Sequence, residues 1–393
     1  MVRPLDGVTV VTLEHAIAAP FCTRQLADLG ARVIKIERPG SGDFARDYDT
    51  RVRGLASHFV WTNRSKESVT LDVKHPDAKQ VLERLLERAD VLVQNLAPGA
   101  AARLGLGFAE VSQKHPRLIV CDISGYGSDG PYADKKAYDL LIQSESGFLS
   151  VTGTPDTPSK AGNSIADISA GMYAYSSILA ALLQRARTGR GSHIDVALLE
   201  TMVEWMSFPL YYAFEGAPPP QRTGAAHATI YPYGPFRAGD GKLVMFGLQN
   251  EREWSVFCDK VLRHPGLATD ARFASNAARV AARGELDAAI HAAFAPLTAP
   301  DVVARLDAAG IANARINDVA EVWQHPQLAA RGRWVSVGTP QGTVPALKPP
   351  AGLDGVEPRM DPVPALGEHT AAVLRELGYA DDTIARLRAQ SAI

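Results

Sequence analysis

The sequence is poor in cysteine and carries no excess of charge of either sign. Its 3 cysteines, Cys22, Cys121 and Cys258, are odd in number and far apart among 393 residues. This excludes a disulfide framework and a paired Cys-x-x-Cys site, so we expect all three to be small buried apolar side chains. The formal net charge is −2 without a basic stripe, which argues against a nucleic-acid partner.

Neither the pattern expected of a secretory leader nor a long apolar run is found in the sequence. Its first residues carry no charged region followed by an apolar stretch. The longest aliphatic patch, 178–183, is too short to span a bilayer. We therefore expect a cytoplasmic protein with no membrane partner.

Motifs of several common enzyme classes are missing. There is no G-x-x-x-x-G-K-[ST] phosphate loop, no H-E-x-x-H zinc helix and no G-x-S-x-G nucleophile turn, so we predict no metal site and no kinase or hydrolase. A G-x-G-x-x-G match at 125–130 follows a predicted strand, but Pro131 stands where a helix must begin. We therefore predict no nicotinamide or flavin cofactor.

The first third of the chain alternates β-rich and helical patterns. This alternation is typical of a parallel α/β sheet, and a length of 393 residues suits two domains. We predict strands at 8–13, 32–37, 91–93 and 118–123, and helices at 20–29 and from Pro76 onward.

Three consecutive prolines at 218–220 predict a linker at 217–224, because proline excludes a continued helix. We assign 1–216 to the first part of a large α/β domain and 225–320 to a smaller α+β domain. The proline-rich segment 321–393 is predicted to complete the large domain as a long ordered loop before a helix at 370–377. In the smaller domain we predict a hairpin of 231–237 with 242–247 and helices at 250–262, 283–293 and 299–309.

One carboxylate stands at the start of an apolar helical pattern. Asp167 precedes residues at the i, i+3, i+4 spacing of a buried helical face, and T-G-R-G at 188–191 supplies a stop signal. Asp167 is therefore expected at or beside the N-cap, where the helix dipole and the unpaired N–H groups stabilise an anion by roughly 0.3–1 kcal/mol. An ionised carboxylate can attack an acyl group, but the local pattern alone favours a mere helix cap, because Asp is common at helix starts.

Polar residues follow the predicted strands. His15, Arg38 and Asn95 each come after one strand, and the carboxyl ends of parallel strands line one ligand-binding crevice. Arginine and lysine bind phosphate oxygens, so a phosphate-rich ligand suits this edge, although each side chain alone also fits a solvated surface charge. Further basic residues in connecting segments are Lys74, Arg103 and Lys136.

Taken together, ordered motifs along the chain resemble the class III CoA-transferase family. The match extends to L-G-E-H-T at 366–370 and so covers essentially the whole chain. The resemblance implies a doubly wound, Rossmann-like large domain, a smaller domain from the middle of the chain, and an interlocked homodimer. The motifs are V-I-K-I-E-R-P-G-S-G-D at 33–43, N-R-S-K-E-S-V-T-L-D-V-K at 63–74, Q-N-L-A-P-G at 94–99, S-G-Y-G-S-D-G-P at 124–131, and the Asp167 helix.

The resemblance also implies roles for single positions. Asp167 matches the family's catalytic aspartate, which accepts an acyl group as an anhydride and then carries CoA as an aspartyl thioester. The substrates are an acyl-CoA and small carboxylic acids, with CoA as part of the substrate and no prosthetic group. Further positions match residues that bind CoA in this family: His15, Arg38, Leu71, Lys74, Asn95, Arg103 and Lys136. Among them, the resemblance implies that the basic residues Arg38, Lys74, Arg103 and Lys136 mainly contact the adenine and phosphate groups.

Some positions depart from the formyl-CoA transferases of this family. A glycine run in their small domain corresponds to F-G-L-Q-N at 246–250 here, and Ile17 replaces a polar glutamine. These differences argue against oxalate as the acceptor acid. The segments 223–227 and 230–233 look more like the branch that acts on succinate, glutarate, itaconate or mesaconate.

Two alternatives remain. The α-methylacyl-CoA racemases of the same superfamily use a His-Asp dipeptide together with an aspartate at the position of Asp167, whereas this chain has Tyr138-Asp139. The missing imidazole, with its pKa of about 6.5, favours a transferase over a proton-exchanging racemase. The second alternative is a non-catalytic acyl-CoA-binding protein.

Overall fold

The computed structural model describes residues 2–393, which divide into two units. The first unit contains 2–147, 161–206 and 327–393, and the second contains 148–160 and 207–326. This division differs from the expected one, because the proline-rich stretch 217–224 lies inside the second unit and not at its boundary. Arg222 ties 148–160 to that unit through hydrogen bonds to the carbonyl oxygens of Thr154 (2.9 Å) and Pro155 (2.8 Å).

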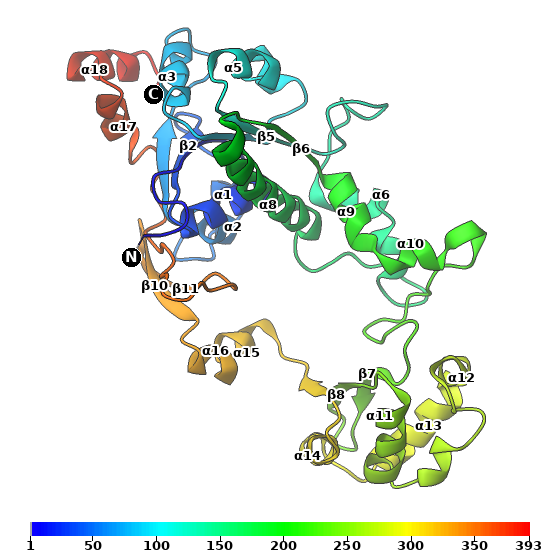
Figure 1. The fold of residues 1–393 in the computed structure, drawn as a ribbon. Coiled ribbons are helices and arrows are strands. Elements are labelled where there is room, and N and C mark those ends of the chain that lie inside the picture. Colours follow the sequence, from blue (N-terminus) through cyan, green and yellow to red (C-terminus); the bar gives the residue numbers. More distant parts are fainter. Residues whose placement is uncertain (1) are drawn as a thin grey trace. The chain divides into compact units, whose positions relative to one another are not determined.

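The first unit is built on a six-stranded parallel sheet in the order β3-β2-β1-β4-β5-β6 (Figure 1). The order reverses between β1 and β4, and ligands of such sheets bind at the carboxyl ends of the strands near that point. The structure confirms the predicted parallel α/β architecture. Strands β3 and β6 were not predicted, because K-E-S-V-T has a single apolar residue and H-I-D-V-A carries two polar residues among its first three. The strands are β1 (Thr9–Leu13), β2 (Arg32–Glu37), β3 (Lys66–Thr70), β4 (Val91–Gln94), β5 (Ile119–Ser124) and β6 (His193–Ala197).

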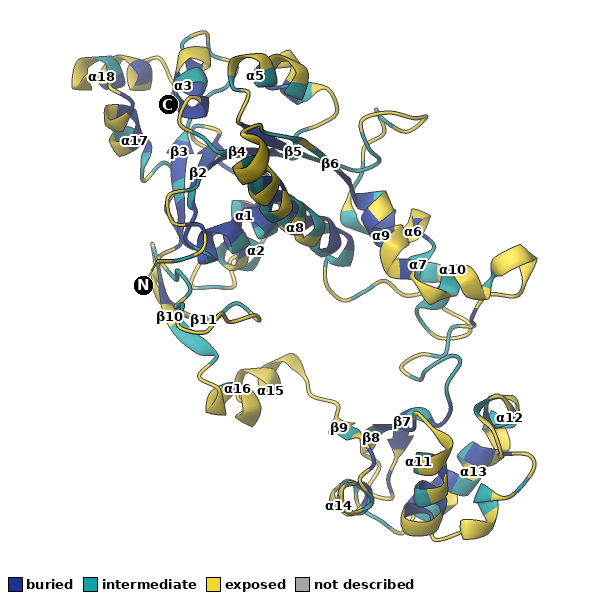
Figure 2. Cartoon of the chain, viewed as in Figure 1, coloured by how far each residue is buried: buried dark blue, intermediate teal, exposed yellow. Residues whose placement is uncertain are grey.

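Helices cover both faces of this sheet, and its strands are buried between them (Figure 2). On one face, Val11, Ile34 and Leu92 belong to an apolar cluster that includes residues of α3 (Ala78–Leu86), α5 (Phe108–Lys114), α17 (Thr370–Glu376) and α18 (Asp381–Ala389). The alternate strand residues point to the opposite face, which α1 (Ala18–Asp28) and α8 (Ile165–Thr188) cover. Lys66 on that face donates a hydrogen bond to the Pro20 carbonyl oxygen of α1 (3.0 Å).

Helix α8 has 24 residues and, by length and composition, is apolar enough to cross a membrane. Its apolar stretch is therefore longer than the patch 178–183 that was considered in the sequence. No other helix among residues 2–393 meets that criterion. Helix α8 packs inside the first unit against α1, β5, β6 and α9 (Leu198–Met206), with Ala170, Ala174 and Ile178 fully buried. Shorter elements of this unit are η1 (Phe44–Asp47), α2 (Ser57–Thr62), α4 (Ala100–Arg103) and α6 (Asp139–Glu145).

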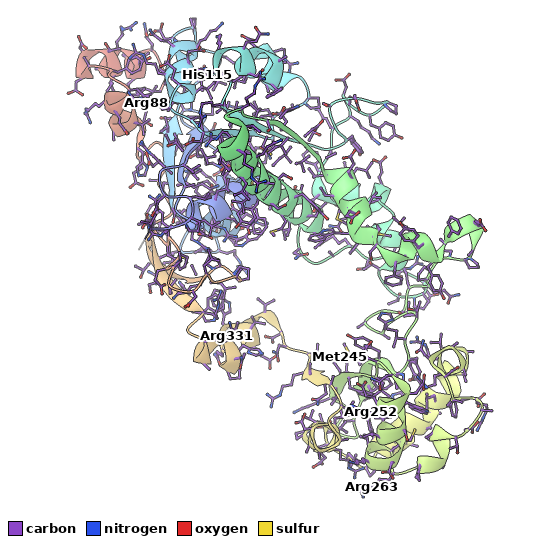
Figure 3. The ribbon with its side chains drawn as sticks, viewed as in Figure 1. Arg88, His115, Met245, Arg252, Arg263 and Arg331 are labelled. Atoms are coloured by element: carbon purple, nitrogen blue, oxygen red, sulfur yellow. The ribbon has the colours of Figure 1, made fainter. Side chains whose placement is uncertain are left out.

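The C-terminal segment contains more regular structure than predicted. The antiparallel strands β10 (Trp334–Thr339) and β11 (Gly342–Leu347) form a hairpin where a long loop was expected. Proline does not prevent it, because Pro340 lies in the turn and each strand of a two-stranded sheet keeps a free edge. The predicted helix at 370–377 is confirmed as α17, and Arg88 after α3 donates to the Glu376 carbonyl oxygen of α17 (2.7 Å; Figure 3).

The same segment covers the outer edge of β3. The Ser68 N–H donates to His369 Nδ1 (3.2 Å), and the His369 N–H donates to the Ser68 carbonyl oxygen (3.0 Å). The Thr70 N–H donates to Thr370 Oγ1 (2.9 Å). Backbone groups at this edge of the sheet are therefore already hydrogen bonded within the chain.

The second unit contains a three-stranded antiparallel sheet in the order β7-β8-β9 and a helical layer. The predicted hairpin and the helices predicted near 250–262, 283–293 and 299–309 are confirmed. Its core is aromatic, with Phe236, Phe246 and Trp254 all nearly inaccessible to solvent. The elements are α7 (Phe148–Val151), α10 (Phe208–Tyr212), η2 (Phe214–Gly216), β7 (Tyr233–Arg237), β8 (Leu243–Gly247), α11 (Glu251–Val256), η3 (Phe257–Val261), η4 (Pro265–Ala268), α12 (Asn276–Ala281), α13 (Arg283–Phe294), α14 (Ala299–Ala309), β9 (Asn313–Arg315) and α15 (Val319–Trp323), with α16 (Pro326–Ala330) at the return to the first unit.

Candidate active site

The carboxyl ends of β1 and β4 are joined by reciprocal hydrogen bonds. The His15 N–H donates to Asn95 Oδ1 (2.9 Å), and Asn95 Nδ2 donates to the His15 carbonyl oxygen (2.9 Å). The His15 ring stacks on Phe44 with 5.2 Å between the ring centroids. Two of the residues expected to bind a ligand therefore meet where the strand order reverses.

The turn after β1 has a backbone conformation that requires support. Ala16 has a φ of 60°, which residues with a side chain rarely adopt. Asp43, which is completely buried, accepts hydrogen bonds at Oδ1 from the N–H groups of Ala16 (3.1 Å) and Ala45 (2.9 Å). This carboxylate fixes the turn that leads from His15 into α1.

Asp43 belongs to a buried ionic network made of Glu14, Lys35, Asp43 and Lys66, none of them more than 3% exposed. Lys35 Nζ lies 2.7 Å from Asp43 Oδ2, and Lys66 Nζ lies 2.6 Å from Glu14 Oε1. Burial alone would raise the pKa of Glu14, but the charges of Lys66 and Lys35 outweigh it and hold that pKa at about 2. Burial lowers the pKa of Lys66 to about 8, against the opposing charge of Glu14.

The four basic residues expected at the CoA phosphates are exposed. Arg38 follows β2, Lys74 follows β3, Arg103 ends α4, and Lys136 lies in the segment after β5. Within residues 2–393 none of them forms an ion pair, and Arg103 makes only a long hydrogen bond to the Pro98 carbonyl oxygen (3.5 Å). Their charges remain available to an anionic ligand.

Leu71 differs from the other expected CoA-binding residues because its side chain is buried. It is 1% exposed and lies in the apolar cluster between the sheet and α3. Its N–H donates to the Glu37 carbonyl oxygen (2.8 Å). Any contact of Leu71 with a ligand therefore involves its backbone carbonyl group.

Asp167 is the third residue of α8, and its carboxylate accepts no hydrogen bond within residues 2–393. The N-cap residue Ser164 makes no side-chain cap. Instead Asp139, on α6, accepts hydrogen bonds at Oδ1 from the N–H groups of Ala166 (2.8 Å) and Asp167 (3.2 Å). This corrects the expectation that free N–H groups at the start of the helix stabilise the Asp167 anion.

The Asp167 carboxyl group is a weaker acid than a helix N-terminus suggests. Burial, and next the negative charge of Asp139, raise the pKa of Asp167 to about 7. A helix dipole offers an anion only roughly 0.3–1 kcal/mol, so desolvation and like charge prevail. A carboxylate with a pKa near neutrality is more basic than an exposed aspartate and still substantially ionised at neutral pH.

The face of α8 that carries Asp167 meets the N-terminus of α1. Gly171 lies one turn further along the same face, and a Cβ atom there would stand 2.7 Å from the Ala18 carbonyl oxygen. Helix α1 begins after Ile17 without a side-chain cap, so its first N–H groups lack an intrahelical acceptor. Such a helix start can stabilise an oxyanion close to the Asp167 carboxylate.

Neither the ionic network nor the contact of Asp139 with α8 was predicted from the sequence. The signal for the network is V-I-K-I-E at 33–37, where a lysine alternates with apolar residues in a strand. The family resemblance drew attention to Asp139 only as part of the racemase dipeptide, and no local signal links it to α8, because the backbone N–H groups that it binds lie on that other helix. Cys22, Cys121 and Cys258 are free and buried as predicted, and no His, Cys, Asp or Glu group in 2–393 is arranged to hold a metal ion.

Sequence comparison gives an independent line of argument. The model of CoA-transferase family III matches residues 5–370. A succinate–glutarate CoA-transferase from Agrobacterium fabrum is 36% identical over 390 residues, which cover 95% of this chain and 96% of that protein. An acetyl-CoA:oxalate CoA-transferase from Acetobacter aceti is 36% identical over 337 residues, which cover 85% of this chain and 86% of that protein.

Structural comparison agrees. The crystal structure of a CaiB/BaiF family protein from Brucella suis superposes with a TM-score of 0.83 at 37% identity, covering 96% of this chain and 100% of that one. The resemblance first found in the motifs is therefore confirmed. The chain belongs to CoA-transferase family III.

Proposed function

We propose that this CoA-transferase moves CoA from succinyl-CoA, or another dicarboxyl-CoA, to a free carboxylic acid, with Asp167 as the nucleophile. The relative from Agrobacterium fabrum is named for succinate and glutarate, and the one from Acetobacter aceti for oxalate. Ile17 and the F-G-L-Q-N segment at 246–250 argue against oxalate, as set out above. Longer dicarboxylic acids are therefore the proposed substrates.

The observation that carries this function is the environment of the Asp167 carboxylate. It is partly buried, accepts no hydrogen bond within residues 2–393, and lies near the uncapped start of α1. A carboxylate that only held a helix end would be expected to bond to the N–H groups of that helix, and Asp139 does this instead. Asp167 is thus free to react.

The CoA moiety is proposed to lie along the carboxyl edge of the parallel sheet. The exposed basic side chains would bind its adenine and phosphate groups, because they have no carboxylate partner in the described chain. The His15 and Asn95 pair marks the strand reversal next to the turn that leads to α1. The full proposed set is His15, Arg38, Leu71, Lys74, Asn95, Arg103 and Lys136.

The first half of the reaction is an acyl transfer to Asp167. A carboxylate oxygen attacks the thioester carbonyl carbon of the donor, a C–O bond forms, and the C–S bond breaks with its electron pair leaving on sulfur. The N–H groups at the start of α1 stabilise the oxyanion that precedes bond cleavage. The products are an acyl-aspartyl anhydride and CoA thiolate.

The second half passes CoA through Asp167. The thiolate attacks the aspartyl carbonyl carbon, which releases the donor acid as a carboxylate and leaves an aspartyl-CoA thioester. The acceptor carboxylate attacks that thioester and again releases thiolate, which then attacks the acyl carbon derived from the acceptor. The new acyl-CoA leaves and the Asp167 carboxylate is regenerated, without any redox change.

A racemase is the weaker alternative on structural grounds. Tyr138 replaces the imidazole base of the racemases and is 69% exposed. The carboxylate of Asp139 already accepts hydrogen bonds from two backbone N–H groups and from Gln143 Nε2. Neither residue is placed as a second free base opposite Asp167.

We also propose a cytoplasmic homodimer. Helix α10 of the second unit exposes Phe208, Leu210, Tyr211 and Tyr212, each at least 47% accessible, and its surface is plainly exposed in Figure 2. Apolar patches of this kind mark protein interfaces. Light scattering of the purified protein is expected to give twice the mass of one chain.

The decisive experiment combines succinyl-CoA with a panel of free acids that includes glutarate, itaconate, mesaconate and oxalate. Mass spectrometry should detect new CoA thioesters of the longer acids. Hydroxylamine added with acyl-CoA should inactivate the enzyme and modify the peptide that contains Asp167. Substitution of Asp167 by Asn should abolish transfer while CoA still binds; normal turnover of that variant would reject the nucleophile.

A further inference from the structure

Asp139 replaces the missing local cap at the start of α8. Its Oδ1 accepts from the N–H groups of Ala166 and Asp167, and its Oδ2 accepts from Gln143 Nε2 (2.7 Å). Gln143 is fully buried, and its Oε1 accepts from the Ala161 N–H (2.9 Å). One carboxylate on α6 thus connects the start of α8 to the segment that precedes it.

This arrangement has a direct effect on the neighbouring nucleophile. Asp167 is the third residue of α8, where an acidic side chain reaches back to the N–H group of the N-cap residue. Asp139 Oδ1 accepts from the N–H groups of Ala166 and Asp167, so its negative charge stands beside the Asp167 carboxylate. A carboxylate beside a like charge is less stabilised as an anion and therefore more basic.

We infer that Asp139 is a positioning residue for the reaction, which holds the first turn of α8 and places a negative charge beside the Asp167 carboxylate. The inference rests on the proposed role of Asp167 as nucleophile. The direction of the Asp167 pKa, raised by burial and then by Asp139, supports it. Asp139 would touch no substrate atom and would act through Asp167 alone.

Burial raises the pKa of Asp167, and among the ionisable groups around α8 that the structure describes, Asp139 is the one whose charge raises it further. Arg24 pairs with Asp28, and His193 pairs with Asp122. Burial, followed by the charges of Asp43 and Asp167, raises the pKa of Tyr48 to about 12, so Tyr48 is neutral near neutral pH. The ionisable groups on α8 and on the elements that contact it are Cys22, Arg24 and Asp28 on α1, Glu145 on α6, Glu200 and Glu204 on α9, Cys121 and Asp122 on β5, His193 and Asp195 on β6, and Tyr173, Tyr175, Arg185 and Arg187 on α8 itself, with Tyr48 and Tyr138 in nearby loops.

The test follows the ionisation of Asp167 without any turnover. The folded state raises the pKa of this group above its ordinary 3.8, so folding stability falls as pH rises from that value toward about 7. Asp167→Asn removes this loss, and its stabilising effect grows over the same pH range and then levels off. Thermal unfolding of both proteins against pH therefore reports the titration of Asp167.

The comparison is repeated in an Asp139→Asn background, in which Asn Oδ1 still accepts from α8 but the charge is gone. In this background we expect Asp167→Asn to give a smaller gain in folding stability. That gain should level off at a pH that is lower by about 0.5–1 unit. Glu145→Gln removes a charge from the same helix, at a side chain whose hydrogen-bond partners are Tyr126 and Lys135, and should leave the curve unchanged. An unchanged plateau pH with Asp139→Asn overturns the inference.

Activity gives a second readout. Asp139→Ala also removes the acceptor for α8, so kcat should fall by at least about tenfold with little change in KM for acyl-CoA, while Asp139→Asn restores most of it. A wild-type kcat for Asp139→Ala also overturns the inference. If the protein transfers no CoA, the proposed function fails and the unfolding test still decides about Asp139. If transfer and Asp167 labelling persist while both readouts stay unchanged, only this inference fails.

Discussion

Gly171 on α8 and Ala18 on α1 are so close that a Cβ atom on Gly171 would stand 2.7 Å from the Ala18 carbonyl oxygen. The same atom would stand 2.9 Å from Cδ1 of the Phe21 ring. Neither neighbour is the end of a flexible side chain, so the two helices depend on the missing side chain at this position. The contact sets the distance between Asp167, one turn earlier, and the start of α1.

Gly171→Ala should therefore push α8 away from α1. We expect a loss of stability of about 1–3 kcal/mol from overpacking and a reduced kcat, because the oxyanion donors move relative to Asp167. Gly284→Ala in α13 is the matched control, since nothing lies within 4 Å of that Cβ position. The control should keep its stability or gain at most about 1 kcal/mol. Equal melting curves and kcat for Gly171→Ala and wild type would contradict the contact.

The rate of CoA transfer should depend on pH through Asp167. Nucleophilic attack needs the carboxylate, and burial together with Asp139 raises the pKa of that group to about 7. We therefore expect kcat/KM to rise as pH increases through about 7 and to level off above it. Initial rates with succinyl-CoA and glutarate over this range provide the measurement. A profile that is already flat from about pH 5 upward would mean that an ordinary, low-pKa carboxylate reacts.

The buried ionic network should behave as one unit. Glu14→Gln leaves Lys66 and Lys35 short of a partner in the interior, and we expect a cost of about 3–5 kcal/mol in chemical unfolding. Adding Lys66→Met to Glu14→Gln should cost much less than the sum of the single changes. Additive losses would show that the two side chains are not coupled.

The same network predicts a response to acid. The pKa of Glu14 falls from 4.5 to about 2 on folding, so its stabilising contribution is complete above pH 4.5 and is lost as pH falls toward 2. Glu14→Gln should therefore flatten the acid limb of the stability profile between these values.

Arg38 should contribute to CoA binding through its charge. Arg38→Ala removes an exposed guanidinium that has no carboxylate partner among residues 2–393, and we expect the Kd for CoA to rise about tenfold. Arg388→Ala, a charge removal on α18, serves as the control and should leave the Kd unchanged. Calorimetry with CoA measures both, and an unaltered Kd for Arg38→Ala removes this residue from the proposed site.

Much of the fold could be predicted from sequence periodicity, because the local alternation of apolar and polar side chains determines which segments form strands. The run V-I-K-I-E at 33–37 predicts a strand from its residues alone, and β2 confirms it. Strand β3 was missed because its inward side chains, Lys66 and Ser68, are polar and find their partners elsewhere in the chain. Local pattern cannot reveal such partners.

The same distinction applies to the candidate site. The apolar helix behind Asp167 could be predicted from its spacing, and the structure confirms it as α8. The surroundings of the Asp167 carboxylate could not be predicted, because Asp139 lies 28 residues earlier in the chain and on a different helix. The family motifs pointed to Asp167 as a reacting residue, whereas its basicity follows only from three-dimensional burial and charge.

The outer edge of β3 has one more consequence. An uncovered strand at the border of a sheet is a template on which further chains can polymerise. Here His369 and Thr370 already bond to the N–H groups of Ser68 and Thr70 and to the Ser68 carbonyl oxygen, so these groups are not open to an incoming chain. Resistance to fibrous aggregation at high concentration should accordingly depend on how firmly this short stretch stays docked, more than on the charge of the protein's exterior.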